Sequence, residues 1–234
     1  MISIHQSQFL PWPPYFYKIL KSDIFIILDD VQYQKNGMQN RNTIKTPNGE
    51  AYLTVPVTHK SHYLINEVTI ANKLFFSKML KTLKSNYSKA RYFEVIFESI
   101  NNLVVSKNYL NLYDFNNDLI ILLLALMKID TKIKLSSEFS LSSKKGDLVL
   151  DLILATKECN YIIGSGGLNY IDLDKFSENA VNLYQYKFSN TAYKQLWPKL
   201  GFIENLSIID LLFNELETSK EYLLANGSLN MVKD

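Results

Sequence analysis

Cysteine is almost absent from this sequence, and neither sign of charge is in surplus. A single cysteine, Cys159, in 234 residues excludes an internal disulfide and a multi-cysteine metal site, and it fits a reducing compartment. The 25 basic and 23 acidic side chains nearly cancel. The chain therefore has no overall charge of the kind that holds a protein on DNA or anionic lipid, and any phosphate must be held by local groups.

Apolar runs long enough to cross a bilayer are also missing. Leu119–Met127 is strongly apolar but is bounded by Asn117 and Asp118 before it and by Lys128 and Asp130 after it. This length suits a buried helix rather than a transmembrane span. The first residues lack the basic region and apolar run of a secretory signal. We therefore expect a cytoplasmic protein without membrane insertion.

Strand-like and helix-like segments alternate along the chain. With 47% hydrophobic residues, the sequence can bury a substantial core. The alternation favours an α/β fold with a mainly parallel, Rossmann-like sheet and helices on both faces. We expect one domain over residues 1–234, with a helical insert around residues 73–128. The expected strands are Ser3–His5, Asp23–Leu28, Ala51–Val57, Lys132–Leu135, Tyr161–Gly164 and Val181–Tyr186. The expected helices are Trp12–Lys21, Phe75–Asn86, Tyr92–Val105, Tyr109–Met127, Gly146–Lys157 and a last one with Ser207 as N-cap, and a helix or turn is expected around Asp172–Ser177.

Polar residues follow the first two expected strands, at the edge where an open α/β sheet binds ligands. His5 can act as a general acid or base, or donate to a phosphate, because its proton titrates near neutral pH. Asp29 and Asp30 end the second strand and share this edge if the strands are parallel. One of them could orient a base or bind a divalent cation. The alternatives are a histidine that caps the sheet edge and aspartates that form a turn.

The segment Asp29–Asn48 is polar and lacks apolar periodicity, which predicts an extended active-site loop. Its amides can read hydroxyl-rich or base-like ligands, and Arg41 can bind a phosphate or carboxylate through two donors. A disordered surface loop is the alternative, but Tyr33 and Met38 interrupt the polar run and favour a binding loop. The expected binding residues of this segment are Gln32, Lys35, Asn40, Arg41 and Lys45.

Two later segments also carry candidate binding residues. Gly164-Ser165-Gly166-Gly167 follows an expected strand, and its backbone amides can cradle an anion. It matches neither a Walker A loop nor GxGxxG, and Ser165 lacks the GxSxG context of a nucleophile. Farther along, an aromatic and an amide side chain can bind a sugar or a base, although tyrosines are often structural. The expected binding residues here are Ser165, Gly166, Gly167, Tyr193 and Gln195.

Several motifs in fixed order resemble those of one known family. They are Ile4-His5-Gln6-x-Gln8-Phe9-Leu10-Pro11-Trp12, Tyr15-Phe16-x-Lys18-Ile19, Asp29-Asp30-Val31-Gln32-Tyr33, Asn40-Arg41-Asn42-x-Ile44-Lys45, Leu53-Thr54-Val55-Pro56-Val57, Asn86-Tyr87, Ser165-Gly166-Gly167, Tyr193-x-Gln195 and Leu206-Ser207-Ile208-Ile209-Asp210. Together they closely resemble the WbqC-like family over nearly the whole chain. Ser7 and Pro14 depart from the family pattern, where a proline and a glycine are common.

The resemblance implies a bacterial protein of surface-polysaccharide biosynthesis, where nucleotide-linked deoxyamino sugars are built and decorated. We therefore expect an acyl- or aminoacyl-type transferase that modifies the amino group of such a sugar in O-antigen biosynthesis. His5 would take the proton from the attacking amine, and Asp29 or Asp30 would orient the base or the substrate. The motif around the first strand adds the expected substrate-binding residues Gln6, Gln8 and Tyr15.

The cationic residues of the polar segment would hold the charged part of a substrate. Lys35, Arg41 and Lys45 are the candidates for binding a diphosphate or an anionic donor. We expect no metal site and no tightly bound cofactor. The donor is left open between an acyl group, an aminoacyl group and ATP.

Two further hypotheses remain open. The opening of the chain is similar to nucleotidylyltransferase-like folds, whose HxGH signature contacts ATP phosphates, although Tyr15 and Phe16 stand in the region of the second histidine. An ATP-dependent, adenylate-forming enzyme that activates a carboxylate is therefore one alternative. A non-catalytic protein that binds a nucleotide-linked sugar is the other. The helical middle, Leu74–Met127, is a lid, a homodimer surface or simple packing, and periodicity does not separate these.

Overall fold

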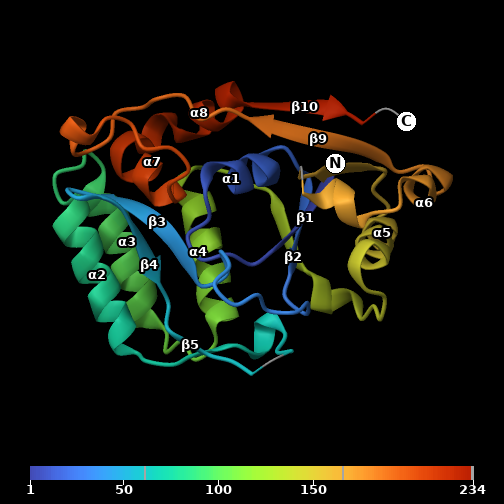
Figure 1. Ribbon diagram of the computed structural model, residues 1–234, viewed down its shortest axis with the longest axis horizontal. Coiled ribbons are helices and arrows are strands. Elements are labelled where there is room, and N and C mark those ends of the chain that lie inside the picture. Colours follow the sequence, from blue (N-terminus) through green and yellow to red (C-terminus); the bar gives the residue numbers. More distant parts are fainter. Residues whose placement is uncertain (61, 165, 233–234) are drawn as a thin grey trace.

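A six-stranded sheet lies at the centre of the computed structural model, which describes residues 1–60, 62–164 and 166–232 (Figure 1). The strand order is β10-β9-β8-β1-β2-β7, and every neighbouring pair is parallel except β9 and β10. The predicted α/β class with a mainly parallel sheet is thus confirmed. The strands are β1 (Ile2–Gln6), β2 (Ile24–Leu28), β7 (Lys132–Leu135), β8 (Asn160–Ile163), β9 (Asn182–Phe188) and β10 (Gly227–Met231).

Helices cover both faces of this sheet, as the apolar strands require. In β2, Phe25 and Ile27 belong to one buried cluster and Ile26 belongs to another, because successive side chains of a strand point to opposite faces. The first cluster includes α1 (Pro13–Leu20), α7 (Ile208–Glu215) and α8 (Ser219–Asn226). The second includes α5 (Lys145–Thr156) and α6 (Leu173–Glu178).

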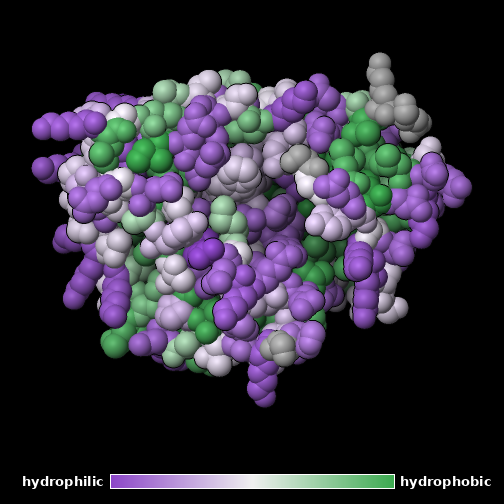
Figure 2. Space-filling view, in the orientation of Figure 1, coloured by the Kyte–Doolittle hydropathy of each residue, from purple (hydrophilic) through white to green (hydrophobic). Residues whose placement is uncertain are grey.

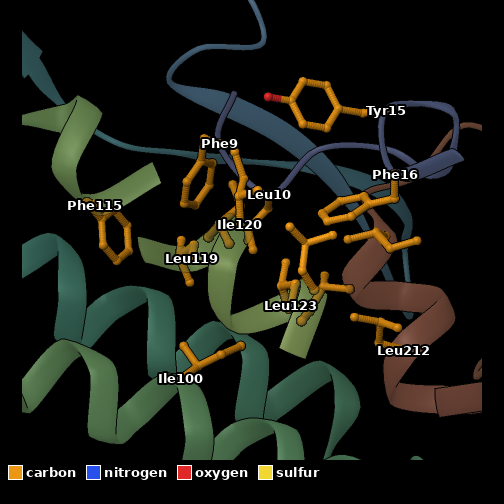
Figure 3. Packing of buried hydrophobic residues seen from close by; sticks show 14 of the residues in the cluster. Phe9, Leu10, Tyr15, Phe16, Ile100, Phe115, Leu119, Ile120, Leu123 and Leu212 are labelled. Carbon is orange, nitrogen blue, oxygen red and sulfur yellow. The ribbon is translucent and has the colours of Figure 1, made fainter. Parts of the chain in front are cut away.

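The predicted helical middle is confirmed as α2 (Leu74–Tyr87), α3 (Phe93–Ser106) and α4 (Leu112–Leu126). Its apolar residues join the same cluster as α1 and α7. Figure 3 shows Phe9 and Leu10, from the segment after β1, pointing toward Leu119 and Ile120 of α4. The helical middle therefore shares one core with one face of the sheet. Among the described residues, no helix is both long and apolar enough to cross a membrane.

The prediction of a loop over Asp29–Asn48 is wrong in its second half. Arg41–Thr46 forms β3, which pairs antiparallel with β4 (Gly49–Thr54). The strand was missed because two of its buried side chains, Asn42 and Lys45, are polar and mask the apolar alternation that marks a strand. The expected strand Ala51–Val57 is shifted as a result.

Two C-terminal elements were also missed, namely α8 and β10. The residues of α8 do not gather into one apolar stripe, and β10 is an edge strand whose side chains are mostly exposed. A Cβ at Gly227, which begins β10, would lie 2.1 Å from the Tyr17 ring. Glycine is required there by this close approach. The remaining short elements are β5 (Val57–Thr58), β6 (Thr69–Ile70) and the 3₁₀ helices η1 (Ile65–Glu67), η2 (Ser136–Phe139), η3 (Gly167–Tyr170), η4 (Pro198–Leu200) and η5 (Leu216–Thr218).

Candidate functional site

The strand order reverses direction at β1. From β1 the chain passes through α1 to β2 on one side, and it returns through α5 to β8 on the other side. Open α/β sheets bind ligands at the carboxyl ends of the strands where this reversal occurs. In this sheet the position is marked by Gln6, at the end of β1, and by Gly164, directly after β8. Figure 2 shows one face hollowed near its centre, with hydrophilic residues in the hollow.

His5 lies on β1 at this edge and is partly buried. Its Nδ1 is 3.2 Å from the carbonyl oxygen of Gln6. A carbonyl oxygen only accepts, so Nδ1 carries the proton and Nε2 keeps its lone pair. Burial lowers the pKa of His5 to about 3, with a further lowering by the positive charge of Lys18. The ring is therefore uncharged at neutral pH, with Nε2 as a proton or hydrogen-bond acceptor.

Tyr15 and Gln39 contact His5 and Gln6 at the end of β1. The Tyr15 ring meets the His5 ring edge-on, with 5.1 Å between centroids, and its hydroxyl donates to the carbonyl oxygen of Gln6 at 3.2 Å. Gln39 Nε2 donates to Gln6 Oε1 at 2.8 Å, and Gln39 Oε1 accepts from the backbone nitrogen of Gln34 at 2.7 Å. Two of the predicted binding residues, Gln6 and Tyr15, are thus brought together with His5.

The segment after β1 has a strained backbone that the polar segment supports. Leu10 has φ of 42°, a left-handed conformation that residues with a side chain rarely adopt. Asn42 Nδ2 donates to the Leu10 carbonyl at 2.7 Å, and the Phe9 nitrogen donates to the Met38 carbonyl at 3.0 Å. The polar segment Asp29–Asn48 therefore shapes the loop that borders the sheet edge.

Helix α4 contributes two polar residues that we did not predict. Asn117 accepts at 3.1 Å from the buried hydroxyl of Ser7, and Asn116 donates to the carbonyl of Gln39 at 2.8 Å. Asn116 Oδ1 and Gln8 Oε1 are buried and have no hydrogen-bond partner among the described residues. The signal was the amide pair Asn116-Asn117 just before the apolar run Leu119–Met127, and Asn117 served only as a boundary of that run.

Asp29 and Asp30 are engaged by η2 rather than by His5. Asp29 accepts from the Ser137 hydroxyl at 2.7 Å and its backbone nitrogen at 3.0 Å, and the Ser136 hydroxyl reaches both carboxylates. No hydrogen bond joins either carboxylate to His5 in the described part of the chain. In residues 1–60, 62–164 and 166–232, no three His, Cys, Asp or Glu side chains group as metal ligands. The structure thus gives Asp29 a capping role, and its catalytic role stays a prediction.

Lys45, Tyr193 and Gln195 lie together in a separate buried network. Lys45 Nζ donates to Gln195 Oε1 at 3.0 Å and to the Gly201 carbonyl at 2.6 Å. Tyr193 donates to Asp210 at 2.8 Å. These partners tie β3 to the segment before α7, so the contacts observed for the three residues are internal ones.

The other residues of the polar segment face different surroundings. Asn40 donates to the Val55 carbonyl at 3.0 Å. The Arg41 guanidinium carbon lies 4.6 Å from the centroid of the Tyr52 ring, a cation–π geometry, and Arg41 is half-buried. Gln32 and Lys35 are exposed. Of this set, Arg41 keeps the arrangement best suited to an external anion.

The glycine loop follows β8 as expected, but Ser165 lies outside the described residues. Gly166 is exposed, and a Cβ there would meet nothing within 4 Å. A Cβ at Gly167 would lie 2.6 Å from Ile163 Cγ1. Glycine is therefore needed at Gly167 for close packing of the chain on β8, while the backbone at Gly166 is open to the surface.

Comparison with known proteins agrees with the motif pattern. Residues 6–222 match the WbqC-like protein family. A Mycobacterium tuberculosis protein described as "Uncharacterized protein Rv1507c" is 32% identical over 225 residues, which cover 95% of this chain and 96% of the relative. No solved structure matches the chain, and the nucleotidylyltransferase likeness stays a prediction. The family match begins directly after His5 and spans the polar segment and the glycine loop, and the chain belongs to the WbqC-like protein family.

Proposed function

We propose that this protein is an acyl- or aminoacyl-type transferase that modifies the amino group of a nucleotide-linked deoxyamino sugar in surface-polysaccharide biosynthesis. The observation that carries the proposal is the uncharged His5 ring, whose Nδ1 is bonded to the Gln6 carbonyl. This bond leaves Nε2 as an acceptor at the sheet edge where α/β proteins bind ligands.

The chemistry of acyl transfer to an amine needs such an acceptor. The amine nitrogen forms a bond to the carbonyl carbon of the donor, His5 Nε2 takes a proton from that nitrogen, and the donor's leaving group departs with the electron pair of the broken bond. An anionic substrate near His5 would raise the pKa of the ring, because an opposite charge favours the imidazolium. The ring would thereby approach the basicity of an effective general base.

Groups beside His5 suit a polar substrate. Gln6, Gln8 and Gln39 line the end of β1 with amides, which pair with hydroxyl and amide groups. Arg41 is half-buried against the Tyr52 ring and is close in sequence to Gln39, so it is our candidate for the diphosphate. The sugar amine would then point toward His5.

A ligand screen followed by a turnover assay tests the proposal. Thermal shift is measured with UDP-, GDP- and dTDP-linked amino sugars, ATP, coenzyme A and acyl donors. A ligand at about a hundred times its Kd stabilises the fold by roughly 2.7 kcal/mol. A selective shift with a nucleotide-linked amino sugar, and a product mass increased by the acyl group, support transfer.

The substitution His5→Gln tests the base. Turnover should fall by about 10²- to 10⁴-fold, while His62→Gln, at an exposed position, should leave it unchanged. Pyrophosphate release from ATP with a carboxylic acid would instead establish the adenylate-forming alternative. Tight sugar-nucleotide binding without product under any donor would establish a non-catalytic binding protein.

A further inference from the structure

Lys18 is a buried lysine that our sequence reasoning did not place in the site. It lies on α1 with 2% of its surface exposed, and its Nζ donates to the carbonyl oxygen of Ile4 at 3.1 Å. Ile4 directly precedes His5 on β1. The side chain of Lys18 therefore ends against the strand that carries the candidate base.

The charge of Lys18 is not balanced by an acid. Among residues 1–60, 62–164 and 166–232, no carboxylate forms an ion pair with it. Nearby polar groups are the hydroxyls of Ser3 and Ser22, which bond to the Lys18 carbonyl at 3.4 and 2.8 Å. A buried ammonium without a counter-ion is costly to stability, so its position calls for a role other than packing.

His5 is the titratable group that this charge affects. After burial, the Lys18 charge is the second cause that lowers the pKa of His5. Burial also lowers the pKa of Lys18 itself, to about 7. Tyr15 is the other titratable group against His5, and burial raises its pKa, so its hydroxyl stays uncharged. Opposite His5 in the sheet, β2 presents the apolar Ile27.

We propose that Lys18 is a positioning residue. Its ammonium, held against the strand of His5 by the bond to the Ile4 carbonyl, adds to burial in disfavouring the charged His5 ring, while the Gln6 carbonyl keeps the proton on Nδ1 and leaves Nε2 free to accept. A nearby ammonium disfavours a second positive charge on the ring. It also makes a protonated His5 a stronger acid, which returns its proton readily to a leaving group. The inference rests on the proposed function only in the role of Nε2 as the proton acceptor during transfer. The protonation state of His5 itself is measurable without substrate.

Nuclear magnetic resonance of the histidine ring nitrogens tests this inference. The chain has three histidines, and His5→Gln identifies the signals of His5 by their loss. In the wild-type protein we expect His5 to show the uncharged, Nδ1-protonated ring between about pH 4 and about pH 8. A wild-type His5 that titrates near the ordinary value of about 6.5 would overturn the inference.

The substitution Lys18→Met then removes the charge while keeping a side chain of similar length. We expect the His5 titration to move upward, although not to the ordinary value, because burial remains. Lys45→Met is the matched control, since Lys45 is also buried but donates to Gln195 and Gly201. It should leave the His5 titration unchanged. Equal His5 midpoints in wild type and Lys18→Met would contradict the inference.

Lys18→Arg provides a second test that does not depend on the folding of Lys18→Met. It keeps the positive charge, so His5 should remain uncharged over the same pH range; a titrating His5 in this variant would count against the inference. If His5→Gln does not lower turnover but Lys18→Met still raises the His5 titration midpoint, the proposed function is refuted. The role of Lys18 is then still supported.

Discussion

Lys45 and Gln195 are 150 residues apart in the sequence and are joined by a hydrogen bond of 3.0 Å from Nζ to Oε1. The same network includes Asp210, which accepts from Tyr87 and Tyr193, both at 2.8 Å. Burial raises the pKa of Asp210, and the two tyrosine hydrogen bonds act in the opposite direction. Family motifs from four parts of the chain thus meet in one buried polar network.

Tyr87→Phe should destabilise the fold by about 2–4 kcal/mol. The Tyr87 hydroxyl donates to Asp210 Oδ2 and accepts from the backbone nitrogen of Lys45 at 2.9 Å, so its removal takes one hydrogen bond from each of two buried groups, although Asp210 keeps its bond from Tyr193. Urea unfolding followed by circular dichroism measures the change. Tyr170→Phe, at a position that is 74% exposed, serves as control, and equal stability of the two variants would show that the network contributes little.

His5 should make the fold less stable in acid. Its folded pKa, about 3, lies below the ordinary value of 6.5, so the unfolded chain binds the proton more readily and stability falls as pH drops from about 6.5 toward about 3. We expect a contribution on the order of 2–4 kcal/mol. Unfolding midpoints measured across this range should depend less steeply on pH in His5→Gln. Parallel curves for the two proteins would refute this linkage.

Lys18 should make the stability of the fold depend on pH in alkaline solution. Its folded pKa of about 7 lies below the ordinary 10.5, so the unfolded chain binds more protons between these values and stability rises with pH across this window. The rise should be on the order of 5 kcal/mol. Lys18→Met should lack it and be more stable than the wild type near pH 7. If the stability of Lys18→Met rises with pH as much as that of the wild type, the pKa of Lys18 is not lowered by burial.

Gly166 and Gly167 form a matched pair in the loop after β8. Gly167→Ala should cost about 1–3 kcal/mol, because the new Cβ would lie 2.6 Å from Ile163 Cγ1. Gly166→Ala should change stability by less than about 0.5 kcal/mol, since a Cβ there meets nothing within 4 Å. If the loop binds the substrate, Gly166→Ala should still weaken the thermal shift. Stability losses of the same size in both variants would disagree with the packing described here.

The predictions of strands and helices were confirmed where a segment buries a run or a regular pattern of apolar residues. Phe25–Ile27 of β2 and the helices α2 to α4 are such segments, and Ser207 is the N-cap of α7, accepting from the Ile209 nitrogen at 3.3 Å. Arg41–Thr46 was missed because it buries Asn42 and Lys45 in place of apolar side chains. The edge strand β10 was missed because its residues are mostly exposed.

By itself, the sequence determined the class of the fold, the edge of the sheet where His5 lies, and the family, because strand and helix periodicity and short motifs are local properties of the chain. Only the tertiary structure decided which polar residues are partners. Lys45 and Lys18 are both buried lysines, yet one bonds to Gln195 and the other ends against the strand of His5. A lysine acquires its charge state and its role from the groups packed around it, and those come from distant segments.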